Sequence, residues 1–140
     1  MSAIDRFSGK YEFLSNFYPR DITYDGILFF TNEHAFQAAK TFNLIEKVAI
    51  SHMETPGKAK KAGQQVTLRP DWEEVKYNVM SEICMIKFVT HKDLRLQLLD
   101  TGDSQLIEGN NHGDKTWGTV NGEGTNWLGK ILMEIRNRLK

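Results

Sequence analysis

The stretch that decides the fold is TNEHAFQAAK, residues 31–40. Thr31 suits the N-cap of a helix, because its hydroxyl can accept a hydrogen bond from a backbone N–H of the first turn. At helical spacing, one broad face collects the apolar residues Ala35, Phe36, Ala38, Ala39 and Phe42. The opposite face carries Glu33, Gln37 and Lys40. The segment predicts a helix with one packing face and one face that presents chemistry, although taken alone the commoner interpretation is a polar face in solvent.

Length and charge narrow the class of protein. The 140 residues are enough for one domain with its own core, and 18 basic side chains balance 18 acidic ones. A neutral chain lacks the basic surplus of a dedicated nucleic-acid binder, although a local cluster of cations can still hold a phosphate. We therefore expect a single domain spanning residues 1–140.

The cysteine, the histidines and the hydropathy pattern bear on location and cofactors. The one cysteine, Cys84, lies among apolar residues, so we expect it to be buried rather than reactive. A single cysteine forms no disulfide within the chain, which fits a reducing compartment. Residues 1–6 lack the apolar run of a signal peptide and no segment has the length of a membrane span, so we expect a cytoplasmic protein. The four histidines are scattered singly, and we expect no metal and no cofactor.

Residues 7–30 are rich in aromatic residues and turn signals, and we expect this part of the chain to be largely β. The runs 22–24 and 27–30 flank Asp25-Gly26, and Asp-Gly between two β-prone runs is a strong hairpin signal. The hairpin leads directly to Thr31. We expect Glu33 to lie where the helix N-terminus opens toward a cleft.

The middle of the chain predicts three helices. We expect the helix from Asn32 to continue into the forties and a short helix to follow over residues 46–52. Thr55 as cap, Pro56 in the first turn and Gly63 at the end delimit a further compact helix.

The remaining helices show clear apolar periodicity. The longest begins after Arg69-Pro70-Asp71 and carries an apolar stripe at Trp72, Val75, Val79, Ile83 and Ile86. Another is expected over residues 91–99, and a last one from Thr125 or Asn126 toward the C-terminus. Together the elements predict an α+β fold, a single compact and mostly helical domain with a small β-hairpin near the N-terminus.

The segment 109–129 holds six of the eleven glycines: Gly109, Gly113, Gly118, Gly122, Gly124 and Gly129. Such a density indicates backbone with positive φ or close approach to a ligand. The glycine-rich approach to a helix N-terminus also suits a phosphate, because it offers free backbone N–H groups. The spacing is that of neither the dinucleotide fingerprint nor a P-loop.

Several blocks in order resemble the NADAR superfamily over nearly the whole chain. The blocks are EFLSNFYP at 12–19, EHAFQAAK at 33–40, Lys60 with Gly63, RPDWE at 69–73, DKTWG at 114–118 and GTNWLG at 124–129. The resemblance implies the NADAR/YbiA-like fold and the activity of its YbiA-like branch, an N-glycosidase acting on phosphoribosylamino-pyrimidine intermediates of riboflavin biosynthesis. Other branches of the superfamily act on ADP-ribose, including its release from modified guanine in DNA.

The resemblance places two carboxylates, Glu33 and Asp114, in its distinctive blocks. Breaking an N-glycosidic bond builds positive charge on the ribose, so the reaction calls for a carboxylate near the anomeric carbon and a proton for the leaving nitrogen. We assign Glu33 to stabilising the oxocarbenium-like centre or activating water, and Asp114 to the complementary acid or base role. The reverse assignment stays open.

Further residues are expected to bind the substrate. The cations Lys40, Lys60 and Arg69 suit its phosphate, since fixed cations position an anion and favour it electrostatically. Lys40 shares a helix face with Glu33, so the alternative that it holds this carboxylate ionised stays open. Trp117 either stacks on the departing base or plugs the core. The other expected contacts come from polar side chains near these blocks: Ser15, Asn16, Gln37 and Asn126. Asn126 suits a helix cap, a ribose contact or both, and Ser15 and Asn16 either wall the pocket or belong to an aromatic core.

Three alternatives to the metabolite-directed enzyme remain. The first is a glycohydrolase that releases ADP-ribose from guanine in DNA, for which the partner is ADP-ribosylated nucleic acid. The second is a sensor that binds ADP-ribose or a related nucleotide without catalysis. The third is an interaction protein that uses its aromatic N-terminal part. For all but the last, the ligand is a phosphoribosyl or ADP-ribosyl compound.

Overall fold

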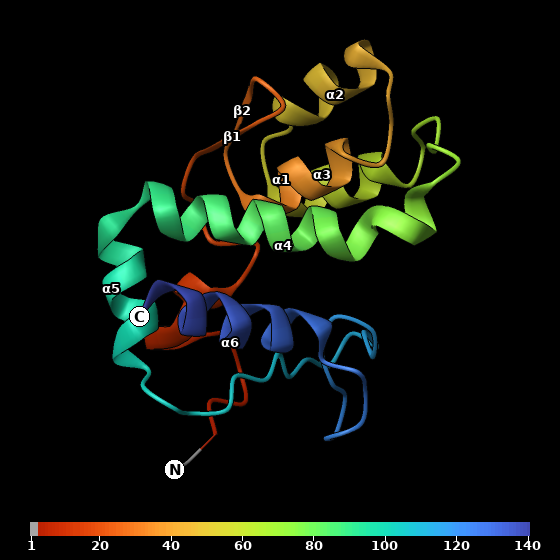
Figure 1. Ribbon diagram of the computed structural model, residues 1–140. Helices are drawn as coiled ribbons and strands as arrows, with labels where there is room; N and C mark the ends of the chain where they lie inside the picture. The colour runs from red at the N-terminus through yellow and green to blue at the C-terminus, as the bar shows by residue number, and fades with distance from the viewer. Residues whose placement is uncertain (1–2) are drawn as a thin grey trace. The chain divides into compact units, whose positions relative to one another are not determined.

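The computed structural model describes residues 3–140 and contains two compact units (Figure 1). We call residues 16–90 the central unit, and residues 3–15 together with 91–140 the terminal unit. Helices dominate both, and the central unit also holds a two-stranded antiparallel sheet. The predicted α+β class is confirmed.

The sheet of the central unit is the predicted Asp-Gly hairpin. Strands β1 (Ile22–Tyr24) and β2 (Ile27–Phe29) pair with Ile22 opposite Phe29. Asp25 and Gly26 have φ values of 52° and 77°, the left-handed conformations of the two-residue turn that best matches strand twist. Ile22 and Phe29 are almost fully buried, so one face of the hairpin belongs to the core.

Helix α1 (Asn32–Ala38) begins as predicted but is shorter than expected. Thr31 caps it, accepting a hydrogen bond from the His34 N–H at 3.2 Å. The helix does not continue into the forties, because two polar side chains bind nearby backbone N–H groups instead. Thr41 accepts from the Asn43 N–H, and Asn43 accepts from the Glu46 N–H. Asn43 thereby caps the next helix, α2 (Leu44–Ser51).

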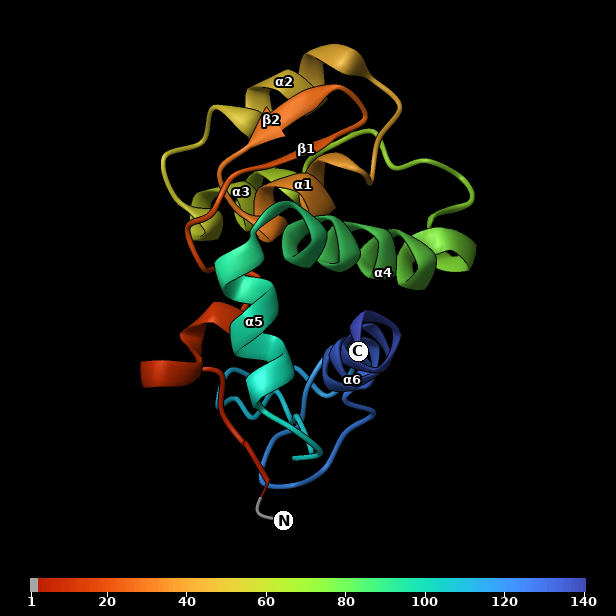
Figure 2. The same cartoon turned by 60° about the vertical axis from the view of Figure 1, so that its left-hand side comes forward.

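Two more helices complete the central unit. Helix α3 (Pro56–Gly63) is capped by Thr55, whose hydroxyl accepts from the Lys58 N–H at 3.1 Å. Helix α4 (Trp72–Thr90) is the longest, and the hairpin, α1 and α3 lie along one side of it (Figure 2). Trp72 and Cys84 are buried, as predicted.

The terminal unit is built from helices α5 (Lys92–Asp100) and α6 (Trp127–Leu139) and a 3₁₀ helix, η1 (Gly9–Leu14). The expectation of β structure is wrong for residues 9–14, whose aromatic residue Phe13 reaches the core from a helical turn. Ile4 exchanges backbone hydrogen bonds with residues 105 and 107, each at 2.8 Å. Arg136 of α6 is 6% exposed and its guanidinium donates to the Thr101 hydroxyl and the Ser104 carbonyl. These bonds tie α6 to the chain that leaves α5.

Among residues 3–140, none of the helices has both the length and the apolar character needed to cross a membrane.

Candidate functional site

The polar face of α1 is buried rather than solvated. Glu33 is 8% exposed and Gln37 3% exposed, because α2, α3, α4 and the hairpin all pack against α1 (Figure 1). The solvent interpretation of this face is therefore wrong. A carboxylate is rarely buried unless it is bound by partners, so this position invites a functional explanation.

The Glu33 carboxylate is held from its own helix. Gln37 lies one turn later and its Nε2 donates to Glu33 Oε2 at 2.5 Å. The backbone N–H of Glu33 donates to the Asn16 carbonyl at 3.0 Å. Both ends of the residue are thus fixed by groups of the central unit.

Asn16 anchors the start of α1 to α4. It is 8% exposed, its Oδ1 accepts from Asn32 Nδ2 at 3.1 Å, and its Nδ2 donates to the sulfur of Met80 at 3.3 Å. Ser15, its neighbour in sequence, is half-buried in the terminal unit, where its N–H donates to the Glu12 carbonyl. Asn16 therefore has a clear structural function beside Glu33.

Lys40 follows α1 and is half-buried. Burial lowers its pKa, the charge of Glu33 raises it, and the charges of Lys60 and Lys76 lower it further. These influences mean that Glu33, Lys60 and Lys76 all lie within electrostatic reach of the Lys40 ammonium group. We call Lys40, Lys60 and Lys76 the lysine cluster. It is a suitable place for an anion.

Lys76 was not anticipated from the sequence. It extends from the first half of α4, half-buried, and binds Glu73 at 2.6 Å. The sequence shows that Lys76 lies outside the apolar stripe of α4. Its position in the sequence gives no sign that it lies near Lys40 and Lys60 in space. Only the packing of α1 and α4 brings it near Lys40.

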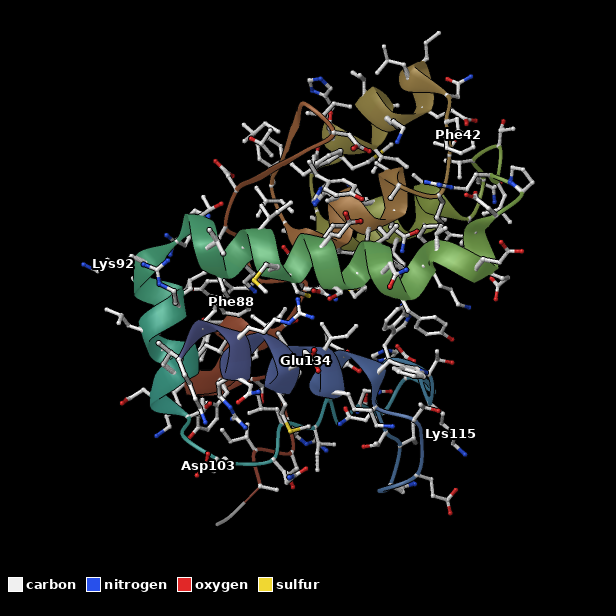
Figure 3. The ribbon with its side chains drawn as sticks, viewed as in Figure 1. Phe42, Phe88, Lys92, Asp103, Lys115 and Glu134 are labelled. Carbon is white, nitrogen blue, oxygen red and sulfur yellow. The ribbon has the colours of Figure 1, made fainter. Side chains whose placement is uncertain are left out.

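Arg69 is already paired within the central unit. Its Nε and Nη2 donate to the two carboxylate oxygens of Asp71 at 2.6 and 2.9 Å, and this pairing raises the pKa of the guanidinium. Its backbone N–H donates to the Lys40 carbonyl at 2.7 Å. Phe42 does not join the packing face of α1, because it is 63% exposed at the surface (Figure 3). The centre of its ring lies 4.3 Å from Cζ of the Arg69 guanidinium. Arg69 thus holds the chain beside Lys40, with its charge largely balanced.

Asp114 organises the glycine-rich segment of the terminal unit. Its Oδ1 accepts hydrogen bonds from the N–H groups of Thr116 and Trp117 at 3.0 and 2.9 Å. The Asn110 side chain binds both the N–H and the carbonyl of Asp114. Asp114 and Trp117 are half-buried, and Lys115 between them is exposed (Figure 3). One oxygen of Asp114 therefore shapes the loop that carries Trp117.

Asn126 stands at the start of α6 but does not cap it. Its φ of 56° is left-handed, whereas a capping residue is normally extended. Its Oδ1 accepts from the Glu108 N–H and its Nδ2 donates to the Leu106 carbonyl, both at 3.0 Å. The predicted cap is wrong, and the side chain instead fastens the segment 106–108 to the start of α6. A side chain at Gly129 would clash with the Asn126 amide and with the Leu106 carbonyl, which explains why glycine occupies this position.

Two buried side chains on α4 bear on reactivity. Burial raises the pKa of the Cys84 thiol to about 12, so this cysteine is a packing residue, as predicted. Lys87 is 2% exposed, with its ammonium 5.5 Å from the centre of the Tyr18 ring, and burial lowers its pKa to about 8. Lys87 was missed, although it follows the buried Ile83 by one helical turn.

The structure groups the predicted site residues as follows: Asn16, Glu33, Gln37, Lys40, Lys60 and Arg69 belong to the central unit, and Ser15, Asp114, Trp117 and Asn126 to the terminal unit. The pairing of Glu33 with Asp114 stays a prediction. Within residues 3–140 no group of three or more His, Cys, Asp or Glu side chains is arranged to hold a metal ion.

The chain belongs to the NADAR domain family, whose model matches residues 5–140. It is 38% identical over 135 residues to the N-glycosidase YbiA of Shigella flexneri serotype 5b, a match covering 94% of this chain and 84% of that protein. It is 37% identical over 131 residues to a riboflavin biosynthesis protein of Vibrio vulnificus, covering 91% of this chain and 35% of that protein. The NMR structure of Escherichia coli YbiA matches with a TM-score of 0.88 at 36% identity, covering 99% of this chain and 84% of that one. This similarity confirms the predicted fold.

Proposed function

We propose that the protein is a hydrolase that cleaves the N-glycosidic bond of a phosphoribosylamino-pyrimidine, an intermediate of riboflavin biosynthesis. The observation that carries the proposal is the buried Glu33 carboxylate within electrostatic reach of Lys40, the central member of the lysine cluster. A phosphorylated ribose has both features that this arrangement complements, an anion at one end and a developing cation at the anomeric carbon.

Glu33 acts on the anomeric carbon. As the bond to the base lengthens, positive charge spreads over the ribose ring, and a fixed carboxylate stabilises that charge more strongly in a dry site than in water. The same carboxylate can orient a water molecule for attack on the ring. Asp114 supplies the complementary proton transfer, to the leaving nitrogen.

The lysine cluster binds the phosphate. The charges of Lys60 and Lys76 lower the pKa of Lys40, so an anion bound beside Lys40 relieves this repulsion, and the phosphate in turn fixes the ribose. Trp117 offers a flat surface for the departing base, and Ser15 and Asn126 complete the contacts expected from the terminal unit. Arg69 contributes by holding the backbone of Lys40.

The names of the relatives support both the reaction and the pathway. The Shigella relative is named an N-glycosidase and the Vibrio relative a riboflavin biosynthesis protein. Two aspects of the proposal go beyond the names, namely the phosphoribosylamino-pyrimidine as substrate and the residues that act on it.

The test compares two substrates with wild type and Glu33→Gln. One substrate is the phosphoribosylamino-pyrimidine, and the other is a DNA oligonucleotide carrying ADP-ribosylated guanine. Glu74→Gln is the matched control, because Glu74 is an exposed carboxylate on α4. We expect sugar release from the pyrimidine with wild type and Glu74→Gln, and its loss in Glu33→Gln. Release from the oligonucleotide alone would move the protein to the ADP-ribose branch, and tight ADP-ribose binding without release from either would make it a sensor.

A further inference from the structure

The amide of Gln37 is confined on both sides. Its Nε2 donates to Glu33 Oε2 at 2.5 Å, and the side chain is 3% exposed. Its Oε1 is fully buried and has no hydrogen-bond partner among residues 3–140. A buried amide oxygen without a donor is costly, so the surroundings must hold this arrangement in place.

Gly63, the last residue of α3, lies against the Oε1 side of the Gln37 amide. A Cβ at Gly63 would overlap Gln37 Oε1 and lie 2.8 Å from Cδ. Gly63 ends α3 as predicted, but it is itself helical and Gln64 follows in the right-handed region, so no positive φ explains the glycine. The requirement for glycine is therefore the close approach of Gln37.

The direction of the amide follows from charge. With Nε2 toward Glu33, a donor meets the carboxylate oxygen, which favours the ionised form. In the opposite orientation two oxygens would meet at hydrogen-bond distance, which only a protonated Glu33 could satisfy. The charge of Glu33 acts on Lys40 and raises its pKa, and by the same interaction the Lys40 ammonium group favours the ionised form of Glu33.

We propose that Gln37 is a positioning residue, seated by Gly63, that holds Glu33 ionised and correctly oriented, rather than a residue that contacts substrate. The inference rests on the proposed function for its catalytic meaning. Within the proposed function, the inference gives Glu33 the part of base or electrostatic stabiliser and leaves the acid role to Asp114. It also explains why Gln37, which we expected to bind substrate, is buried where α1 packs against Gly63 of α3.

The first test is kinetic. Gln37→Met keeps the length of the side chain and removes the donor, and we expect kcat to fall by about 10- to 100-fold with little change in KM, since an interaction that serves the transition state is lost. The acidic limb of the pH–rate profile should move to higher pH, because the carboxylate loses a hydrogen bond that favours its charge. A raised KM with unchanged kcat and unchanged pH profile would make Gln37 a substrate contact and overturn the proposal.

The second test concerns Gly63 and uses a matched glycine of the same helix. Gly63→Ala should reproduce the kinetic defect of Gln37→Met, whereas Gly57→Ala should behave as wild type, because a Cβ there meets only the Thr55 hydroxyl at 3.9 Å. In a Gln37→Ala background, Gly63→Ala should add little, since the side chain it displaces is gone. A full additional loss in that background would show that Gly63 acts independently of Gln37 and would contradict the proposed seat.

The third test does not need activity and separates this inference from the proposed function. The Glu33 carboxyl is titrated by carbon-13 NMR in wild type, Gln37→Met and Gly57→Ala. We expect its pKa to rise in Gln37→Met alone. An unchanged titration in Gln37→Met overturns the inference even if the enzyme is active, whereas the expected rise in a protein without N-glycosidase activity would leave the inference standing and reject the proposed function.

Discussion

Lys87 offers a test of the central unit that is independent of catalysis. Its side chain is almost fully buried on α4, and burial lowers its pKa from 10.5 to about 8, with the charge of Arg20 acting in the same direction. The unfolded chain keeps the ordinary value, so between pH 8 and 10.5 the unfolded state binds more protons than the folded state. Under that condition the free energy of unfolding rises with pH.

The size of the effect follows from the two pKa values. One pKa unit corresponds to about 1.4 kcal/mol, so the whole shift represents roughly 3 kcal/mol, of which about 1 kcal/mol is gained between pH 7 and 9. Above pH 9 the thiol of Cys84 has the opposite effect on the free energy of unfolding. Burial raises the pKa of this thiol from 9.0 to about 12, so with rising pH the thiol loses its proton in the unfolded chain before it does so in the folded chain. The window from pH 7 to 9 is therefore the informative one.

Urea unfolding at pH 7, 8 and 9 measures the effect. We expect wild type to gain about 1 kcal/mol relative to Lys87→Met over this range. Lys92→Met is the matched control, since Lys92 is exposed at the start of α5 (Figure 3), and it should follow wild type. If Lys87→Met shows the same pH dependence as wild type, the ammonium does not titrate near pH 8 and the reasoning is refuted.

Three further predictions concern the helix cap, the amide of Asn126 and the lysine cluster. Thr31→Ala should lower the free energy of unfolding by about 1–2 kcal/mol in urea, because the α1 cap is lost, whereas Thr31→Ser should retain most of the stability; equal loss in both would reject the capping argument. Asn126→Ala should cost about 2 kcal/mol in the same assay, because a buried carbonyl and an N–H lose their partners. Asn121→Ala, at an exposed position with the same left-handed φ, should cost clearly less, and an equal cost would assign the effect to backbone strain alone. Lys76→Met should raise KM several-fold with a smaller effect on kcat in steady-state assays, while the exposed Lys130→Met should not, and an unchanged KM would remove Lys76 from the phosphate site.

Local signals account for what the sequence predicted well. The Asp25-Gly26 turn, the cap at Thr31 and the cap at Thr55 are each specified by neighbours within a few residues. The long apolar stripe of α4 likewise depends on periodicity alone. Such features survive folding because no tertiary contact has to create them.

Burial and loop geometry were harder to predict. The residues next to Glu33 and Gln37 in the sequence do not indicate that α2, α3 and α4 pack against this helix. Taken alone, the polar face was therefore expected to be exposed to solvent. Asn126 has the residue type of a cap, but its contacts with residues 106 and 108 depend on a segment about twenty positions away. These features arise from tertiary packing, which overrides the local preference.

The candidate site was therefore predictable in its residue types more than in their functions. Glu33 and Lys40 were identified, and the structure places them within electrostatic reach of each other. Lys76 was not, because it lies on a different helix. Gln37 was expected to touch substrate, and its contacts with Glu33 and Gly63 instead suggest support of the carboxylate.

The most direct test of the account is the turnover number of Glu33→Gln on the phosphoribosylamino-pyrimidine, measured beside wild type with the fold of both verified by urea unfolding. Glutamine keeps the size of the side chain and removes its charge. The account predicts a folded protein whose kcat is lower by about 10²- to 10⁴-fold, the usual contribution of a catalytic acid or base. A folded Glu33→Gln that releases the sugar at the wild-type rate would contradict the central claim that this buried carboxylate performs the reaction.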